Sequence, residues 1–336
     1  MSHRRSHRRL HTITAAGLLL VPLLGLAGCG QESPTNSASG FPATGRLQLI
    51  APAAPGGGWD GTARALSQAV EDSDLVKNPQ VINIEGAGGT IGLARFVADD
   101  DPKQLLVMGA VMIGAIAVNQ SQITIADAVP VARLTGESEV LVVPKDSPFQ
   151  TLDDFTRAFT DDPGGHAIAG GSAGGTDQVT AGLYAEAVGV DPRKVNYIPY
   201  SGGGESLAAI LGGQVAAGIS GVQEWAGQIE SGDLRVLAVS SPERIGSLDA
   251  PTFTEQGVDV EVANWRGILA PPGTTADEVA DIQQFLTEVH DSPQWKQALS
   301  TNGWDDTFMV GPQVAPFFEE QVTEYAGTLK KIGLVE

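Results

Sequence analysis

Short apolar runs alternate along the chain with segments in which apolar residues recur every three or four positions. The runs have the length of buried strands, and the periodic segments have the spacing of helices that pack one face on a core. Strands are predicted at 47–51, 81–84, 105–109, 140–143, 167–169, 195–199, 215–219, 236–239 and 265–270, and helices at 59–70, 91–98, 177–188, 205–211 and 224–229, with a mostly helical segment from 276 onward. This alternation predicts an α/β fold with mainly parallel sheets.

The alternation occurs twice, and 336 residues are too many for one ordinary core. We therefore expect two similar lobes, with lobe I formed by 46–142 and 263–336 and lobe II by 143–262. Apolar strands meet prolines at Val143-Pro144 and Ala270-Pro271, and the chain is expected to cross between the lobes near these points. Two α/β lobes joined by two crossings are typical of type II-like periplasmic binding proteins, the hinged "Venus flytrap" fold that closes on a solute.

The first 28 residues predict an export signal rather than a folded segment. Four arginines precede an apolar run at 15–26, which is too short for a bilayer because a spanning helix needs about 20 residues. The run ends in Leu26-Ala27-Gly28-Cys29, the pattern of a bacterial lipobox, and Cys29 is the chain's single cysteine. We expect cleavage before Cys29, lipidation of its thiol, a flexible tether at 29–45, and a protein anchored to the outer face of the cell membrane. An ordinary signal with an incidental cysteine is the alternative.

Acidic residues outnumber basic ones throughout the chain. The net charge is −20, and it falls to −24 when the signal and its four arginines are removed. This charge disfavours nucleic acid and anionic membrane surfaces as partners. An anionic ligand would have to be held by local chemistry, because the field of the whole protein repels it.

Four glycine-rich loops lie between a predicted strand and the helix that follows it, at 55–58, 86–89, 170–175 and 201–204. The carboxyl ends of parallel strands are where open α/β sheets bind ligands, and a helix N-terminus offers free amides and about half a positive charge. Glycine lets the backbone approach a ligand and adopt positive φ. Any one loop could be a tight turn, but two loops in each lobe predict a trap for a carboxylate, made of amides without arginine.

Two of these loops resemble nucleotide-binding motifs without matching them. Gly58 is followed by Trp59, where a phosphate-binding loop has a lysine. Gly86, Gly88 and Gly92 have the wrong spacing for a dinucleotide fingerprint. We therefore expect no nucleotide cofactor.

The loop around Ser172 matches the nucleophile elbow of serine hydrolases, G-x-S-x-G. In an elbow the helix begins at the serine, which would place Gly174 and Gly175 in its first turn at a cost of about 1 kcal/mol each. A helix that begins after Thr176 as its N-cap is the better prediction. We expect no enzymatic activity, and an exported serine hydrolase using Ser172 is the alternative function.

Metal ligation is not indicated by the spacing of histidine, cysteine or acidic residues. His3, His7 and His11 leave with the signal, and no remaining spacing suits zinc. The run Asp99-Asp100-Asp101 predicts a solvated turn, since no calcium-binding spacing follows it. We therefore predict no metal site.

At the glycine loops the chain resembles the extracytoplasmic receptors of tripartite tricarboxylate transporters, also called Bug receptors. The resemblance covers most of 47 to about 303 and rests on order and spacing rather than on one motif. The matching stretches are 54–60 with 63–64, 86–92, 202–205, 211–215, 232–239, 251–252, 255–257, 265–267 and 270–274. Where many members have Asp-Gly-Tyr, this chain has Asp101-Pro102-Lys103-Gln104. Ser201 replaces a commonly basic residue, which leaves the solute's identity open.

The resemblance implies a monomeric receptor that captures a di- or tricarboxylate, such as citrate, for the large and small integral-membrane subunits of a transporter. It implies that loop amides, hydroxyls and bridging waters hold the carboxylate. The implied lobe I residues are Pro55, Gly56, Gly57, Gly58, Trp59, Asp60, Ala87, Gly88, Gly89 and Thr90, and the implied lobe II residues are Ser172, Gly174, Gly175, Thr176, Asp177, Ser201, Gly202 and Gly203.

Overall fold

The computed structural model describes residues 40–42, 45–200, 203–246 and 248–336. The predicted signal at 1–28, Cys29, most of the predicted tether, Ser201 and Gly202 lie outside the described residues. Within the described residues, no helix combines the length and apolar character needed to span a bilayer.

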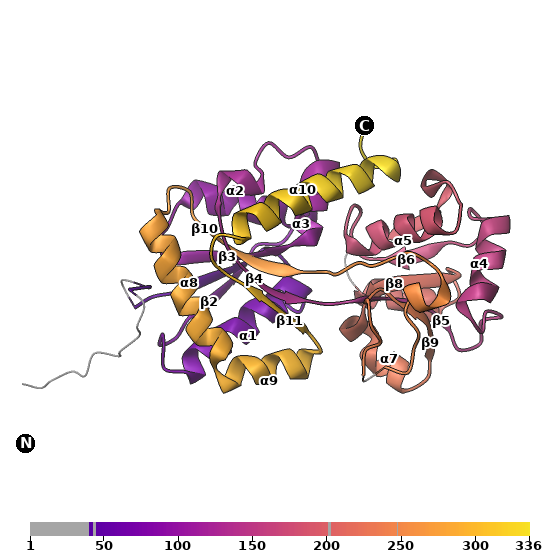
Figure 1. Ribbon diagram of the computed structural model, residues 1–336, viewed down its shortest axis with the longest axis horizontal. Helices are drawn as coiled ribbons and strands as arrows, with labels where there is room; N and C mark the ends of the chain where they lie inside the picture. The colour runs from indigo at the N-terminus through magenta and orange to yellow at the C-terminus, as the bar shows by residue number, and fades with distance from the viewer. Residues whose placement is uncertain (1–39, 43–44, 201–202, 247) are drawn as a thin grey trace, which may run out of the picture. The chain divides into compact units, whose positions relative to one another are not determined.

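The first sheet contains six strands within the described residues, in the order β11-β4-β10-β3-β1-β2. The strands are β1 (Gln48–Ala51), β2 (Gln80–Asn83), β3 (Gln104–Gly109), β4 (Val129–Gly136), β10 (Arg266–Ala270) and β11 (Asp305–Met309). The associated helices are α1 (Gly58–Asp72), η1 (Ala87–Gly89), α2 (Thr90–Asp99), α3 (Ala110–Val118), η2 (Ile125–Asp127), α8 (Ala276–Asp291), α9 (Pro293–Asn302) and α10 (Val314–Lys331), several of which surround the sheet in Figure 1. We call this sheet and its helices lobe I.

The second sheet has five strands in the part of the chain that the structure describes, in the order β7-β6-β8-β5-β9. They are β5 (Glu139–Pro144), β6 (Ile168–Gly170), β7 (Tyr197–Pro199), β8 (Ala217–Gly221) and β9 (Leu234–Val239). The helices are α4 (Leu152–Asp161), α5 (Thr176–Ala187), η3 (Pro192–Lys194), α6 (Gly203–Leu211), η4 (Val222–Trp225), α7 (Ala226–Glu230) and η5 (Thr254–Gln256). We call this sheet and its helices lobe II.

The α/β class is confirmed, but the prediction of mainly parallel sheets is wrong. Strands β2, β1 and β3 run parallel, whereas β10 pairs antiparallel with both β3 and β4. Lobe II repeats the pattern, with β7, β6 and β8 parallel and β5 antiparallel to β8 and β9. Both sheets are therefore mixed. The prediction failed because apolar periodicity identifies a buried strand but not its direction.

The chain passes between the two sheets at 137–138 and again just before β10, rather than at Val143-Pro144 and Ala270-Pro271. The first passage lies between β4, which ends at Gly136, and β5, which begins at Glu139. Residues 139–142, which we assigned to lobe I, thus belong to the sheet of lobe II. The two passages are joined by backbone hydrogen bonds from Glu137 to the Asn264 carbonyl at 3.2 Å and from Asn264 to the Glu137 carbonyl at 2.8 Å.

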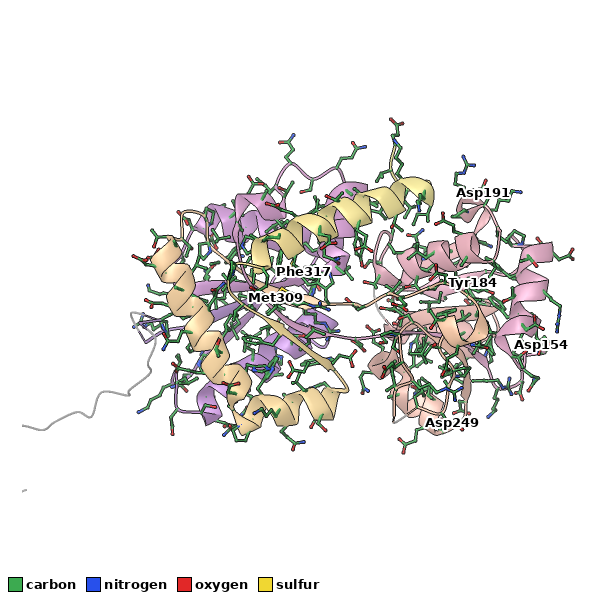
Figure 2. All side chains as sticks on the ribbon, viewed as in Figure 1. Asp154, Tyr184, Asp191, Asp249, Met309 and Phe317 are labelled. Atoms are coloured by element: carbon green, nitrogen blue, oxygen red, sulfur yellow. The ribbon has the colours of Figure 1, made fainter. Side chains whose placement is uncertain are left out.

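Strand β5 is buried on both faces, which explains its continuous apolar sequence. Val140 and Val142 pack into one core cluster, and Leu141 and Val143 pack into another on the opposite face. Tyr184 of α5 lies in that second cluster (Figure 2), and its hydroxyl is 2.8 Å from the Thr156 hydroxyl of α4. This packing holds α5 on the sheet and so fixes the position of the helix N-terminus that follows the loop at 170–175.

Candidate functional site

The loop at 55–58 is held in shape by Asp60, the third residue of α1. The Asp60 Oδ2 atom accepts hydrogen bonds from the Gly56 amide at 2.8 Å and from Arg64 Nε at 2.9 Å, and Oδ1 accepts from Asn83 Nδ2 at 2.8 Å. Burial alone would raise the pKa of Asp60, but these hydrogen bonds outweigh it and hold the pKa below its ordinary value. Asp60 therefore uses its charge to fix the loop.

The second loop of lobe I packs directly on the first. Gly88 and Gly89 have φ of 60° and 90°, in the left-handed region. A Cβ atom on Gly89 would lie 2.6 Å from the Trp59 ring, and one on Gly88 would collide with Ala115. Trp59 is 9% exposed, so it lies beneath the loops as packing between them. The Ala87 carbonyl accepts from the Thr90 hydroxyl at 3.0 Å and from Asn119 at 3.1 Å.

The loop before α5 is also fixed by side chains of the helix that follows it. The Gly171 amide donates to Asp177 Oδ2 at 2.7 Å, and the Gly174 amide donates to Gln178 Oε1 at 2.9 Å. The N-cap of α5 is Gly175 and Thr176 is its first residue, so our prediction of Thr176 as N-cap is wrong by one position. Thr176 is instead buried.

Lobe I and lobe II touch at these loops. A Cβ atom on Gly114 of α3 would collide with the Gly174 carbonyl, and one on Gly175 would lie 3.6 Å from Val111. The first turn of α5 is therefore brought beside α3 of lobe I. This contact between backbones requires a residue without a side chain at position 114.

Arg266, the first residue of β10, was missed by the sequence analysis. Its Nη2 atom donates to Glu137 Oε2 at 2.7 Å and would be 3.0 Å from a Cβ atom on Gly58. Arg266 is 4% exposed, and its guanidinium lies 5.1 Å from the centre of the Trp304 ring. An arginine therefore lies beside the loop at 55–58, where the sequence analysis expected none. A charged residue inside an apolar strand was the available signal, since buried charges need partners.

Carboxyl groups gather at the carboxyl end of β8, on the lobe II side of Arg266. Burial and then the neighbouring Asp177 raise the pKa of Glu139 well above its ordinary value. Burial and then Glu224 raise the pKa of Asp177 to about 7. Partial desolvation and then Glu137 raise the pKa of Glu224, which is exposed. The candidate site thus combines glycine loops, one buried guanidinium and several carboxyl groups.

Comparison with known proteins shows the family to which this chain belongs. Residues 62–334 match the model of the tripartite tricarboxylate transporter family receptor. The chain belongs to this receptor family. Protein BugT of Bordetella pertussis is 30% identical over 324 residues, which are 94% of this chain and 97% of that protein.

Solved structures share the fold of this receptor. The periplasmic binding protein BugD aligns over 86% of this chain and 98% of its own, with 25% identity and a TM-score of 0.72. MatC from Rhodopseudomonas palustris, solved with bound malate, aligns over 86% of this chain and 100% of its own, with 24% identity and a TM-score of 0.72. The family and its structural neighbours are solute-binding proteins rather than enzymes.

The geometry around Ser172 in this receptor differs from a hydrolase elbow. Helix α5 begins at Thr176, four residues after the serine, whereas an elbow places the serine at the start of the helix. His290, on α8 of lobe I, stacks on Phe308 and lies 3.0 Å from an Asp306 oxygen. Among the described residues, no group of three or more His, Cys, Asp or Glu side chains could hold a metal ion.

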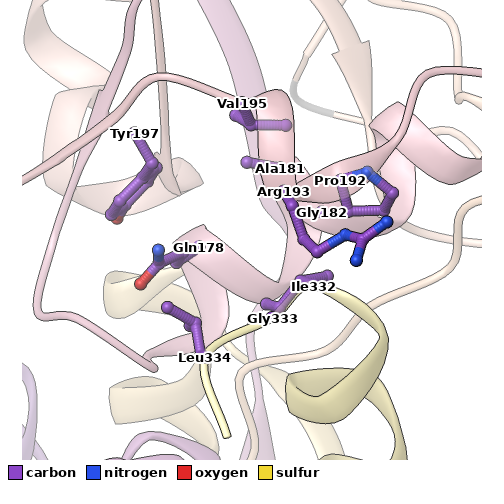
Figure 3. Close-up of a pocket in the computed structure, with 10 residues that line it drawn as sticks. All are labelled: Gln178, Ala181, Gly182, Pro192, Arg193, Val195, Tyr197, Ile332, Gly333 and Leu334. Atoms are coloured by element: carbon purple, nitrogen blue, oxygen red, sulfur yellow. The ribbon is translucent and has the colours of Figure 1, made fainter.

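A cavity of about 180 Å³ in the receptor lies where the segment after α10 meets α5 (Figure 3). Its lining residues are Gln178, Ala181, Gly182, Pro192, Arg193, Val195, Tyr197, Ile332, Gly333 and Leu334. A side chain at Gly182 would collide with Ile332. The cavity therefore marks where the segment after α10 is seated on lobe II.

Proposed function

We propose that this receptor captures a small carboxylate, with di- and tricarboxylates such as citrate as the first candidates. In this proposal the solute passes to the large and small membrane subunits of a tripartite tricarboxylate-type transporter. Family membership supports the receptor role, and a fold neighbour solved with malate is consistent with the carboxylate class.

The observation that carries the proposal is the set of helix N-termini behind the glycine loops. Helices α1, α2 and α5 begin immediately after loops that follow β1, β2 and β6. Their first-turn amides have no acceptor within the helix, and their dipoles favour an anion. Arg266, beside Gly58, adds a cation at this end of lobe I. A carboxylate placed there would accept hydrogen bonds from lobe I amides.

The proposed site comprises the lobe I residues 55–60 and 87–90 and the lobe II residues Ser172, Gly174, Gly175, Thr176, Asp177 and Gly203, together with Ser201 and Gly202 outside the described residues. Asp60 and Trp59 contribute by holding the lobe I loops in shape. The hydroxyl of Ser172 would donate to the ligand directly, at a gain of about 1 kcal/mol.

Mass spectrometry of the ligand that co-purifies with the receptor is the direct test. Titration calorimetry with citrate, malate and succinate then measures affinity, with Gly88→Val as the disrupted site. Gly61→Ala in α1, where an added Cβ atom would meet no neighbour, is the matched control. We expect a carboxylate to bind the wild type and the control but not Gly88→Val. Failure of every carboxylate to bind would contradict the proposal.

We further propose that the receptor acts as a lipid-anchored monomer held through Cys29. The Leu26-Ala27-Gly28-Cys29 sequence supports this proposal. Cells fed labelled palmitate should label the wild-type protein, and Cys29→Ala should lose the label while the protein keeps its ligand affinity. Label that persists in Cys29→Ala would exclude this cysteine as the lipid acceptor.

A further inference from the structure

Helix α5 of lobe II also packs against lobe I. Val179 of α5 is 3% exposed and belongs to the core cluster of lobe I, whereas Tyr184 belongs to a core cluster of lobe II. Leu183, between them, packs against both clusters. Helix α10 of lobe I contacts α5 as well as α3. The helix that begins just after the loop at 170–175 is therefore held by both lobes.

The end of α10 is fixed to α5 by an apolar contact and an ion pair. Ile332, directly after α10, is 8% exposed and packs so closely on Gly182 that any side chain there would collide with it (Figure 3). Lys331 Nζ lies 3.4 Å from Glu186 Oε1, and both side chains are exposed. Because exposed ion pairs contribute little, the contact of Ile332 with Gly182 is what holds this end of α10 on α5.

A second meeting point of the two helices is polar. Tyr325 of α10 lies near Thr176, the first residue of α5. Burial raises the pKa of the Tyr325 hydroxyl, and the nearby Thr176 hydroxyl lowers it in part. The spacing from Tyr325 to Ile332 matches the spacing from Thr176 to Gly182, at about 10 Å along each helix. Helices α10 and α5 therefore meet at an apolar point and, nearer to the loop at 170–175, at a pair of hydroxyl groups.

These two hydroxyl groups are close to each other without being bonded. Thr176 is fully buried and Tyr325 is 6% exposed. Among the described residues, neither Thr176 Oγ1 nor Tyr325 Oη has a hydrogen-bond partner of normal geometry. Buried hydroxyl groups without a partner are rare and costly. A small movement of the first turn of α5 toward α10 would let the two groups bond to each other and would remove this cost.

We propose that Tyr325 and Thr176 form a latch between the lobes, which closes by a hydrogen bond between their hydroxyl groups when the receptor captures its solute. Ile332 keeps the end of α10 seated on α5 while the first turn of α5 moves. Tyr325 is then a positioning residue, because it acts on the solute through the N-terminus of α5 and does not touch the solute itself. The proposal rests on the proposed receptor function, in which capture draws the lobes together.

Glu139 is the competing partner for the Tyr325 hydroxyl. Its buried carboxyl group has no hydrogen-bond partner within the part of the chain that the structure describes, and its charge also raises the pKa of Tyr325. Glu139 begins β5, however, so a bond from Tyr325 to Glu139 would not act on α5. Variants of both Tyr325 and Thr176 separate these two pairings.

A latch that is open in the free receptor predicts opposite effects on stability and on affinity. Tyr325→Phe removes a buried hydroxyl group that has no partner, so the free receptor should unfold at the same urea concentration or a higher one. The same substitution removes a hydrogen bond of the closed receptor, so the solute should bind about three- to tenfold more weakly, mainly through faster dissociation. A residue that only supports the fold would lower the stability and leave the affinity unchanged.

The experiment compares the wild type, Tyr325→Phe, Thr176→Val and the double variant. We would measure the urea midpoint of each receptor freed of solute, and its affinity and dissociation rate with citrate, malate and succinate as probes. Each single variant should weaken binding, and the double variant should weaken it no further, because both substitutions remove the same hydrogen bond. Thr323→Val is the matched control, since the exposed Thr323 hydroxyl donates to the Glu319 carbonyl of its own helix at 3.0 Å. This control should leave the affinity unchanged.

A lower urea midpoint in Tyr325→Phe would show that its hydroxyl is already bonded in the free receptor and would overturn the latch. Additive losses of affinity in the double variant would overturn the pairing, because Thr176 and Tyr325 would then act through different partners. If the wild type binds none of the three acids, the proposed function fails separately. The urea midpoints of the two single variants then decide the latch, since a fall in either overturns it and a rise in both supports it.

Discussion

Arg266 Nη2 and Glu137 Oε2 lie 2.7 Å apart, and the two buried residues come from the two places where the chain passes between its sheets. Backbone hydrogen bonds between Glu137 and Asn264 reinforce the same junction. Any hinge motion of the lobes has to act on this pair, because both strands of the junction carry one of its members.

Replacing one member of the Arg266–Glu137 ion pair should lower the free energy of unfolding more than replacing both members does. Arg266→Met leaves Glu137 buried without a counter-ion, and we expect the free energy of unfolding to fall by about 3–5 kcal/mol. Adding Glu137→Gln should recover part of that loss, which urea denaturation and a double-mutant cycle would measure. Arg157→Met is the control, because Arg157 pairs with Asp153 and Asp154 on the exposed face of α4 and should contribute less than about 1 kcal/mol. Additive losses in the double variant would show that the two residues act independently.

Asp60 should be a positioning residue for the ligand loop rather than a ligand. Asp60→Asn weakens the bonds to the Gly56 amide and Arg64, so we expect about 1–3 kcal/mol of lost stability together with weaker ligand binding. The pKa of Asp60 is lowered in the folded state, so its contribution is present above about pH 4 and is lost as pH falls through the folded pKa. Denaturation curves at pH 3 and pH 6 would test this, with Asp99→Asn on α2 as an exposed control. Unchanged affinity in Asp60→Asn would contradict the positioning role.

The glycine loops could be predicted from sequence because their signals are local. Each cluster follows an apolar run within a few residues, and the structure places helices directly behind them, with boundaries close to those expected at α1, α2, α5 and α6. The hydrogen bonds that hold the loops, such as the one that the Gly171 amide donates to Asp177, also join residues close in sequence.

The charged part of the site could not be predicted in the same way. Arg266 meets Gly58 and Glu137 only through the pairing of distant strands, and no periodicity encodes that contact. Strands β4 and β11 escaped prediction for a related reason. β4 carries Pro130 and Arg133, and β11 begins with two aspartates, so neither shows a clean apolar run. These two segments form strands because they pair with neighbouring strands of the sheet, and that pairing leaves no apolar pattern in their own sequences.

Two glycines that look alike in sequence should respond differently to substitution. Gly88 has φ of 60° and its Cβ would collide with Ala115, so Gly88→Ala should cost more than about 1–2 kcal/mol and weaken ligand binding. Gly57 has φ of −74°, an ordinary extended conformation, and its added Cβ would lie 3.2 Å from the Ala54 carbonyl. We expect Gly57→Ala to lower the free energy of unfolding clearly less than Gly88→Ala does. Gly61→Ala, in open space within α1, should stabilise by up to about 1 kcal/mol. Equal losses at positions 57 and 88, measured by urea denaturation, would exclude backbone conformation as the cause.

The acidic cluster should make the ligand-free receptor less stable as pH rises from 5 to 8. Burial and the nearby Glu224 raise the pKa of Asp177 from 3.8 to about 7 in the folded state. Between these values the folded protein holds a proton that the unfolded chain has lost, so the free energy of unfolding decreases with increasing pH. The stabilisation is complete below about pH 4 and is lost as pH rises through 7, by an amount on the order of 2–4 kcal/mol. Glu139, whose pKa is raised by burial and by Asp177, adds to the same decrease of the free energy of unfolding with pH.

Asp177→Asn keeps an acceptor for the Gly171 amide without a titrating group, so the urea midpoint of this variant should vary less between pH 5 and pH 8. A wild-type midpoint that rises toward pH 8, or an equal slope in Asp177→Asn, would mean that these carboxyl groups are already ionised and paired in the free receptor.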